Sequence, residues 1–286
     1  MSIVHKVFKN KKLQQSFLKN GYIIVKLIDV SSCEQLLDYY HQNPNTDKGK
    51  FHSTHFSKDR AYKKAVHKNI IATYKAALEY HLENFQAIFA NFMVKEAHEH
   101  SIMPLHADWT YVDEEDALSL GVWSPLMDTN AKNGMLGVVP KSHLLRKNPR
   151  GPQIPTPFHD YNEYIIEKYG KLLPVKAGEA VIYDHRTLHF SPPNLSNNVR
   201  VAVNIVMTPR NKKLVHYASF GDLEKVAVFH PENEHFYLEY DHFEKPTLGN
   251  PSEHIALKIE PFEQKYIDSV LSAKDILGRI LSKINF

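Results

Sequence analysis

Cysteine is almost absent from this chain of 286 residues, with Cys33 as its single example. A disulfide within the chain is therefore excluded, and so is a zinc cluster built on cysteine thiolates. No apolar run approaches the roughly 20 residues that a membrane-spanning helix needs. The first thirty residues contain no uninterrupted apolar segment of the kind found in secretory signals. We therefore expect a cytoplasmic protein that does not bind a membrane.

A strong excess of one charge is also absent. The net charge is +3 at pH 7 with the histidines neutral, and the one basic run is the short stretch KNKK, Lys9 to Lys12. That run is more typical of a solvated helix start than of a binding arm. A charge this small and this evenly spread argues against nucleic-acid binding, and the oligomeric state stays open.

No internal repeat, low-complexity tract or Gly/Ser linker divides the chain. We therefore expect a single domain over residues 1–286, with mainly helical support in 1–85, a core at about 86–210 and an extension over 211–286. From Gln86 onward, short apolar runs such as EAVIYDH and RVAVNIVM alternate with Gly, Pro and Asn. This texture predicts a mainly β core, a sandwich or barrel, with helices packed outside it.

Helices are predicted from apolar spacing and from capping residues. The stretch LQQSFLKNGYIIVKLI predicts a short helix, a turn at Asn20–Gly21 and a strand. The other expected helices are one capped by Ser31 and Glu34 that runs through Tyr40, one from about Asp59 to Asn84, one in DYNEYIIEKYG with Asp160 as N-cap and Gly170 past its end, and one from about Phe262 to Ile284.

The stretch PLHADWTYVD places His106 two residues before Asp108. Side chains two apart on an extended segment point the same way, so both could bind one metal ion. In a chain with 18 histidines such a pair is expected by chance. His-x-Glu pairs also occur, at His81/Glu83, His230/Glu232 and His242/Glu244. The motif alone is therefore weak evidence for a metal site.

A second stretch, GEAVIYDHRTLHFSPPNLSNNVRVAVNI, contains a further histidine and an arginine that could complete such a site. It predicts two strands, with His189 after the first and Arg200 opening the second. Non-haem iron oxygenases bind the metal through two histidines and a carboxylate on one face. The planar fork of arginine suits a carboxylate, which it binds through two charge-assisted hydrogen bonds. No comparable arrangement of histidine and arginine follows the His-x-Glu pairs.

Together these stretches resemble the phytanoyl-CoA dioxygenase-like family of Fe(II)/2-oxoglutarate oxygenases. The resemblance rests on HADW, on GVWSPLMDTNAKNGMLGVVPKSH and on GEAVIYDHRTLHFSPPNLSNNVR, and it covers roughly Gly21 to Pro209. It implies a double-stranded β-helix, a cupin-like jelly roll, and an enzyme that uses Fe(II), 2-oxoglutarate and O2. The implied reaction hydroxylates an unactivated C–H bond of a small or medium-sized metabolite and releases succinate and CO2.

Carried over residue by residue, the resemblance implies a set of site residues. The implied iron ligands are His106, Asp108 and His189, and Arg200, eleven residues after His189, matches the arginine that binds the distal carboxylate of 2-oxoglutarate. The other candidates are Ser191 beside that arginine, Trp123 and Asn91 in the co-substrate pocket, and Trp109, Tyr111 and His143 near the substrate. For the last three, an ordinary place in the protein core stays open.

This chain departs from the family in two places. The usual PGSH is PKSH here, Pro140 to His143, which leaves the geometry of that turn open. The strand IFANFMVKEA lacks the glutamine that some relatives direct toward 2-oxoglutarate.

Several alternatives remain. His185 is a rival third ligand, although the spacing to Arg200 favours His189 and makes His185 a neighbour of the site. The stretch HEH at 98–100 is more typical of a solvated loop than of a second metal site. The segment over residues 216–243 fits a lid or an outer-strand extension equally well.

Two other functions also stay open. A cupin-like metalloenzyme without 2-oxoglutarate would not need Arg200, and a non-catalytic jelly-roll binding protein would not need the full ligand set. Halogenating relatives have a small residue where Asp108 stands, so this carboxylate favours hydroxylation.

Overall fold

Two antiparallel sheets form the centre of the protein. A computed structural model describes residues 5–45, 49–222, 224–233, 235–240 and 250–273. The larger sheet has the order β1-β8-β5-β10-β3-β2 and the smaller one the order β4-β9-β6-β7. The strands are β1 (Tyr22–Lys26), β2 (Phe51–Ser53), β3 (Phe85–Lys95), β4 (Met103–His106), β5 (Leu120–Pro125), β6 (Gly137–Val138), β7 (Lys171–Leu172), β8 (Glu179–Asp184), β9 (His189–Ser191) and β10 (Arg200–Pro209). This arrangement confirms the predicted double-stranded β-helix.

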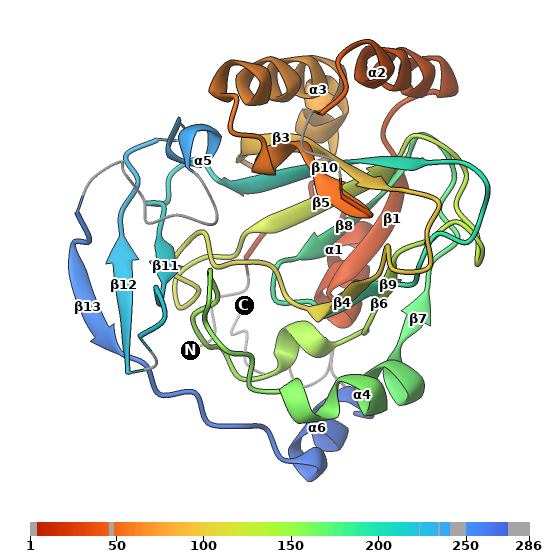
Figure 1. Cartoon of the computed structure of the whole chain (residues 1–286). Coiled ribbons are helices and arrows are strands. Elements are labelled where there is room, and N and C mark those ends of the chain that lie inside the picture. The colour runs from red at the N-terminus through yellow and green to blue at the C-terminus, as the bar shows by residue number, and fades with distance from the viewer. Residues whose placement is uncertain (1–4, 46–48, 223, 234, 241–249, 274–286) are drawn as a thin grey trace.

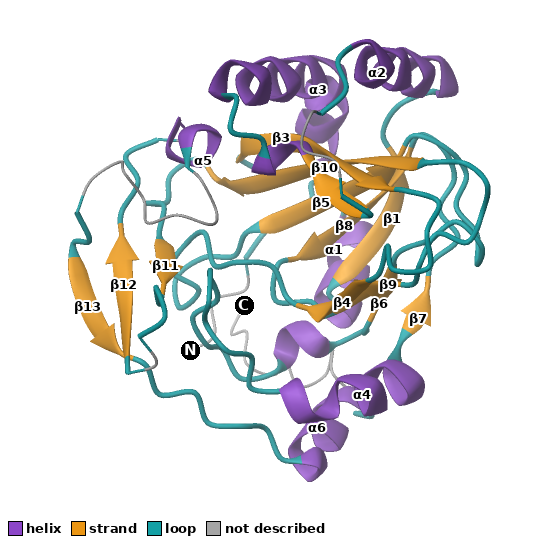
Figure 2. Cartoon of the chain, in the orientation of Figure 1, coloured by secondary structure: helices purple, strands orange, loops and turns teal. Residues whose placement is uncertain are grey.

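Helices cover the outer faces of both sheets (Figures 1 and 2). Helices α2 (Val30–Gln42) and α3 (Arg60–His81) lie over the larger sheet, and α1 (Lys11–Asn20) packs beside β1. Helices α4 (Asn162–Tyr169) and α6 (Gln264–Leu271) pack against the smaller sheet through a cluster that contains Leu105, Phe190 and Ile267. None of the described helices is long and apolar enough to cross a membrane.

A third, separate sheet follows the jelly roll. It contains β11 (His216–Ala218), β12 (Lys225–Phe229) and β13 (Glu253–Ala256), in that order. The short helix α5 (His235–Glu239) lies near it and contacts α3 and β3. The described part of the segment over 216–243 thus supplies β11, β12 and α5, and its function as a lid or as an outer extension stays a prediction. Figure 1 shows this sheet at one side of the molecule.

Strand alternation decides which side chains enter the jelly roll. On β10, Val201, Val203 and Ile205 belong to the cluster packed under the helices. Side chains two apart in a strand share a face, so Arg200 and Asn204, at the alternate positions, point to the opposite side. There they line a cavity between the sheets. The predicted strand pattern thus places one cation inside the protein.

The predicted helices occur, with corrections at their ends. The helix expected from Ser31 begins at Val30, because the Asp29 carboxylate accepts a hydrogen bond from the Ser32 N–H at 2.8 Å. The predicted capping box is therefore wrong. Helix α3 has Asp59 as its N-cap, as expected, but ends at His81, where Leu82 turns to extended backbone.

The two later helices differ more. Asp160 is not an N-cap, because it lies in a 3-10 turn, His159–Tyr161, that runs directly into α4. Gly170 follows that helix as expected. Helix α6 is described only over Gln264–Leu271, and most of the segment expected to continue to Ile284 lies outside the described residues.

The first 85 residues supply the expected strand after the turn at Asn20–Gly21, which is β1, and also β2, which was not expected. These are the two edge strands of the larger sheet. The proposed domain boundaries stay a prediction.

A buried ammonium group joins the two sheets. Lys95, at the end of β3, is fully buried, and its Nζ donates to the carbonyl oxygens of Ser101, Ser191 and Pro192 at 2.5, 3.1 and 2.5 Å. Three donors meet three acceptors, so the ammonium is fully hydrogen-bonded. Since Ser101 precedes β4 and Ser191 ends β9, one side chain holds two strands of the smaller sheet, β4 and β9, against the larger one.

We predict that Lys95→Met destabilises the fold. The substitution keeps the length of the side chain but leaves three carbonyl oxygens without this donor, which lowers the free energy of unfolding by about 2 kcal/mol or more. Urea unfolding at pH 7 measures the change. Lys75→Met on the exposed side of α3 is the matched control; equal stability of both variants would show that the ammonium is dispensable.

Candidate active site

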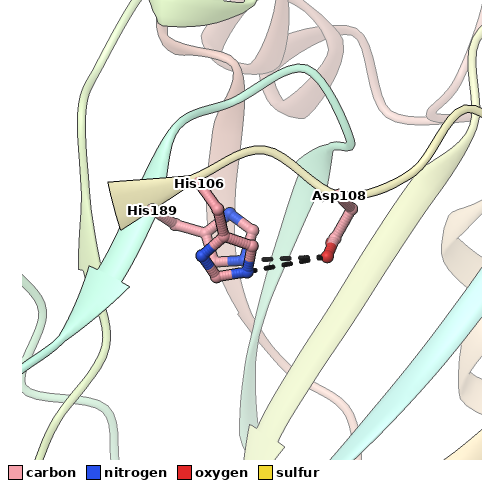
Figure 3. A group of neighbouring side chains, drawn as sticks. All are labelled: His106, Asp108 and His189. Carbon is pink, nitrogen blue, oxygen red and sulfur yellow. Dashed lines mark ion pairs between the residues drawn. The ribbon is translucent and has the colours of Figure 1, made fainter. Parts of the chain in front are cut away.

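The pairing of β4 with β9 brings two histidines together. The strands run antiparallel with His106 directly opposite His189, and the two ring centroids lie 4.1 Å apart. Asp108 follows two residues after His106, just past the end of β4. Figure 3 shows the two imidazoles side by side with the carboxylate facing both.

The three side chains could bind one metal ion. One oxygen, Asp108 Oδ1, lies 4.0 Å from His106 Nε2 and 3.9 Å from His189 Nε2. One ligand atom from each residue lies within 4.8 Å of the others. The other ring nitrogens, Nδ1 of His106 and of His189, lie 2.8 and 3.0 Å from the carbonyl oxygens of Pro104 and Thr187. Since a carbonyl can only accept, each Nδ1 carries the proton and each Nε2 lone pair is free to bind a metal.

The protonation states suit this role. Burial, together with nearby His189, lowers the pKa of His106 to about 4, so its ring is neutral at pH 7. Burial alone would raise the pKa of Asp108, but the three surrounding histidines and a hydrogen bond from Tyr183 outweigh it and hold that pKa below its ordinary value. Imidazole nitrogens with one ionised carboxylate are the donor set that non-haem Fe(II) enzymes use.

Arg200 lies in the same cavity. Its guanidinium is fully buried and stacks over Trp123, 5.4 Å from the ring centroid. Burial lowers the pKa of Arg200 to about 9, so the group is still charged at neutral pH. Among the described residues, Nε and Nη1 find no hydrogen-bond partner. A buried cation with free donors is unfavourable unless an anion pairs with it, so this end of the cavity fits a carboxylate.

The cavity encloses about 440 Å³ of space, part of it open to solvent. Its lining contains His106, Asp108, Trp123, His189, Ser191 and Arg200 among the predicted site residues, and also Phe51, Met93, Met103, Leu136, Tyr183 and Asn204. The Ser191 hydroxyl donates to the carbonyl oxygen of Gly134 at 2.9 Å.

Asn91 does not line the cavity. Its Nδ2 donates to the Ser53 hydroxyl at 2.7 Å on the neighbouring strand. The residue opposite it in register on β10, Asn204, lines the cavity instead and donates to Asn91 Oδ1 at 3.5 Å. Asn91 thus contacts the cavity residue Asn204 without lining the cavity itself, and a role toward the co-substrate stays a prediction.

His143 also lies away from the cavity. Its Nε2 is 3.2 Å from the carbonyl oxygen of Leu18 in α1. The preceding Lys141, which stands where the family has glycine, has φ +73° in the left-handed region. The turn of PKSH thus keeps a conformation that glycine favours, at a local cost of about 1–2 kcal/mol.

Trp109 and Tyr111 join an aromatic cluster beside the site. Tyr111 is buried, with its ring 5.1 Å from that of His185, and Trp109 packs edge-on against His216 at 5.6 Å. Neither residue lines the cavity. His185 hydrogen-bonds the Ser119 hydroxyl through Nδ1 at 2.7 Å, and its Nε2 lies 3.8 Å from Asp108 Oδ2. His185 is thus a neighbour of Asp108, as expected; in the stretch HEH, Glu99 and His100 are exposed and His98 is partly buried.

Two further residues contact Asp108 directly. The Tyr183 hydroxyl donates to Asp108 Oδ2 at 2.7 Å, and Arg150 Nε donates to the Asp108 carbonyl oxygen at 2.6 Å. The strand alternation around Val181 could have indicated that Tyr183 points inward. No sequence signal marks Arg150, which lies 42 residues from its partner.

Comparison with known proteins supports the same conclusion as the geometry. The sequence profile of the phytanoyl-CoA dioxygenase family matches residues 17–202, a range that includes His106, Asp108, His189 and Arg200. The protein is therefore an enzyme of the Fe(II)/2-oxoglutarate-dependent oxygenase class. Within that class, the chain belongs to the phytanoyl-CoA dioxygenase family, as the resemblance indicates.

Solved structures share the fold. The carbocyclase SnoK from nogalamycin biosynthesis aligns with a TM-score of 0.52 and 18% identity, over 72% of this chain and 86% of its own. The epimerase SnoN, in complex with Fe3+, alpha ketoglutarate and nogalamycin RO, gives 0.53 and 16%, over 90% and 96%. HygX from Streptomyces hygroscopicus, with nickel, 2-oxoglutarate and hygromycin B, gives 0.50 and 11%, over 71% and 88%. No curated protein matches this chain.

One buried histidine beside the site has an unusual environment. His216, on β11, is fully buried among the rings of Trp109, Phe236 and Tyr240. Neither ring nitrogen has a hydrogen-bond partner in the part of the chain that the structure describes. Burial lowers the pKa of His216 to about 3, so the ring stays neutral in the folded protein.

We predict that His216→Phe reduces the loss of stability in acid. Below pH 6.5 the unfolded chain takes up a proton at this position and the folded chain does not, so stability falls as pH falls. Between pH 7 and pH 5 this one group lowers the free energy of unfolding by about 2 kcal/mol. Urea unfolding at both pH values should show a smaller decrease for the variant. His254→Phe on the exposed strand β13 is the control; the same reduction there would contradict the explanation.

Proposed function

We propose that this enzyme hydroxylates an unactivated C–H bond of a small or medium-sized metabolite, with release of succinate and CO2. His106, Asp108 and His189 would hold Fe(II), and Arg200 would bind the distal carboxylate of 2-oxoglutarate. The observation that carries the proposal is the buried guanidinium of Arg200, two nitrogens of which find no partner among the described residues, in the same cavity as three side chains that could bind a metal. An anionic co-substrate accounts for that charge.

Each residue has a distinct task. The iron and the co-substrate, when bound, supply the oxidising chemistry, and the protein supplies orientation and a protected site. The two imidazoles and the carboxylate would supply three donor atoms to the iron. Arg200 would fix one end of the co-substrate, and the Trp123 ring packs against its guanidinium in the same cavity, which Ser191 also lines.

The two competing functions explain less of the structure. A cupin-like metalloenzyme without 2-oxoglutarate leaves the buried charge of Arg200 without a partner. A binding protein without catalysis leaves the converging lone pairs of His106 and His189 unexplained. Asp108 favours hydroxylation over halogenation, because halide binding in halogenating relatives requires a small residue at that position.

Small molecules are the expected substrates. The structures of SnoN and HygX contain nogalamycin RO and hygromycin B, respectively. These are consistent with a substrate of small or medium size here. A cytoplasmic location and the absence of nucleic-acid partners remain predictions from the sequence.

We predict that the anaerobic protein with Fe(II) and 2-oxoglutarate shows the weak visible charge-transfer band of their complex. His189→Ala should abolish the band, because it removes an iron ligand. Arg200→Ala should shift its titration to at least tenfold higher 2-oxoglutarate, because a charge-assisted pair is lost. Arg210→Ala, at an exposed ion pair with Glu79, is the control. A folded, iron-loaded wild type without the band would refute the use of 2-oxoglutarate.

We predict that turnover places one atom of oxygen from O2 in the product. A screen of small metabolites by succinate release identifies a substrate, and mass spectrometry after reaction under ¹⁸O2 then measures incorporation. Hydroxylation adds one labelled atom to the product. An unlabelled product, isomeric with the substrate or two hydrogens lighter, would instead indicate epimerisation or ring closure, the reactions named for SnoN and SnoK.

A further inference from the structure

Asp108 lies outside the paired strands of the sheet. Strand β4 ends at His106, and residues 107–111 belong to no helix or longer strand. His106 and His189 are fixed by the strand pairing, whereas the main chain of Asp108 takes no part in it. A metal ligand on such a segment needs support from elsewhere, because its donor atom must keep a defined position for tight binding.

Tyr183 fixes the carboxylate. Its hydroxyl donates to Oδ2 at 2.7 Å, while the other oxygen, Oδ1, is the one nearest the two histidines. The hydrogen bond thus occupies one oxygen of Asp108 and directs the other toward the metal position.

Gly121 provides the space for this tyrosine. It lies directly opposite Tyr183 in the β5–β8 pairing. A Cβ atom at residue 121 would be 2.3 Å from Tyr183 Cζ and 2.5 Å from the hydroxyl oxygen. The tyrosine can therefore lie across the neighbouring strand only because that strand has no side chain there.

Arg150 fixes the main chain of the same residue. Its Nε donates to the Asp108 carbonyl oxygen at 2.6 Å, and its two terminal nitrogens donate to the Glu114 carboxylate at 3.0 and 2.6 Å. Both side chains are largely buried, at 11% and 7% exposed. The Thr110 N–H also donates to the Arg150 carbonyl oxygen at 3.0 Å. The segment after β4 is thereby joined to the segment around residue 150.

We propose that Tyr183 and Arg150 are positioning residues that set the metal affinity of the site, one through the Asp108 carboxylate and the other through its main chain. The inference rests on the proposed function only in taking His106, Asp108 and His189 as the metal ligands. It requires no particular substrate and no binding of 2-oxoglutarate.

The test measures Mn(II) affinity of the full chain, with free Mn(II) followed by electron paramagnetic resonance. Tyr183→Phe and Arg150→Met should each raise the dissociation constant for Mn(II) about tenfold or more, the usual effect of removing a residue that orients a ligand. Tyr164→Phe and Arg146→Met are matched controls. Tyr164 donates to the Asp268 carboxylate and Arg146 pairs with Glu260, both away from the metal residues.

A purely structural role would give a different result. In that case the metal-free variants would unfold at lower temperature, and those that remain folded would bind Mn(II) as tightly as wild type. Wild-type affinity in folded Tyr183→Phe and Arg150→Met proteins would overturn the proposal. Loss of affinity in the two control variants as well would overturn it too, because the effect would then not come from Asp108.

Gly121→Ala, on strand β5, should disturb the same contact between Tyr183 and Asp108. It keeps the hydroxyl but displaces the Tyr183 ring, so it should weaken Mn(II) binding about as much as Tyr183→Phe. In combination the two substitutions should add little, because both remove one interaction. Full additivity would contradict the proposal. If Gly121→Ala does not fold, the comparison of Tyr183→Phe with Tyr164→Phe still decides.

The measurements can refute this inference and the proposed function independently of each other. A wild type that binds Mn(II) but not 2-oxoglutarate would refute the proposed function, and the variants would still test the positioning residues. Variants with wild-type affinity for Mn(II) would refute the positioning role and leave the proposed function intact.

Discussion

The register between β4 and β9 is the constraint on which the site depends. It sets His106 opposite His189, and a slip of one residue would turn one of the two imidazoles to the outer face of the sheet. These strands are short, so their own ladder offers few hydrogen bonds to resist such a slip. The buried ammonium of Lys95 compensates, because its carbonyl partners precede one strand and follow the other.

Two buried cations at the same end of the molecule differ in their hydrogen-bond partners. Lys95 and Arg200 are direct neighbours across the β3–β10 pairing. Burial and the nearby Arg200 charge lower the pKa of Lys95 to about 7, and three carbonyl oxygens satisfy its donors. Two nitrogens of Arg200, Nε and Nη1, have no hydrogen-bond partner among the residues that the structure describes. One cation completes the fold and the other is left for a ligand, which is why only Arg200 is an informative functional signal.

The strand texture was enough to predict a β sandwich or barrel, and the resemblance to the oxygenase family narrowed it to a jelly roll and implied that His106, His189 and Arg200 share one site; the structure places all three in one cavity. Predictions were less accurate where two nearby residues could fill the same position, such as a helix cap or a place in the cavity lining. Asp29 replaced Ser31 as a cap because a carboxylate two residues earlier reached the same turn. At the paired positions Asn91 and Asn204, only the packing decides which side chain lines the cavity, and in the structure it is Asn204. The contact of Arg150 with Asp108 joins segments of irregular backbone, for which a single sequence contains no periodic signal.

The left-handed Lys141 connects parts of the chain that are far apart in sequence. Its N–H donates to the carbonyl oxygen of Asn20 at the end of α1, and its Nζ donates to those of Leu271 and Ala273 at the end of α6. Glycine would relax this turn yet could make only the first of these contacts. The left-handed backbone of Lys141 is unfavourable locally, but the side chain of this residue holds the end of α6 in place. Replacing Lys141 by glycine, the residue that the family has there, would relieve the turn and remove these contacts to α6.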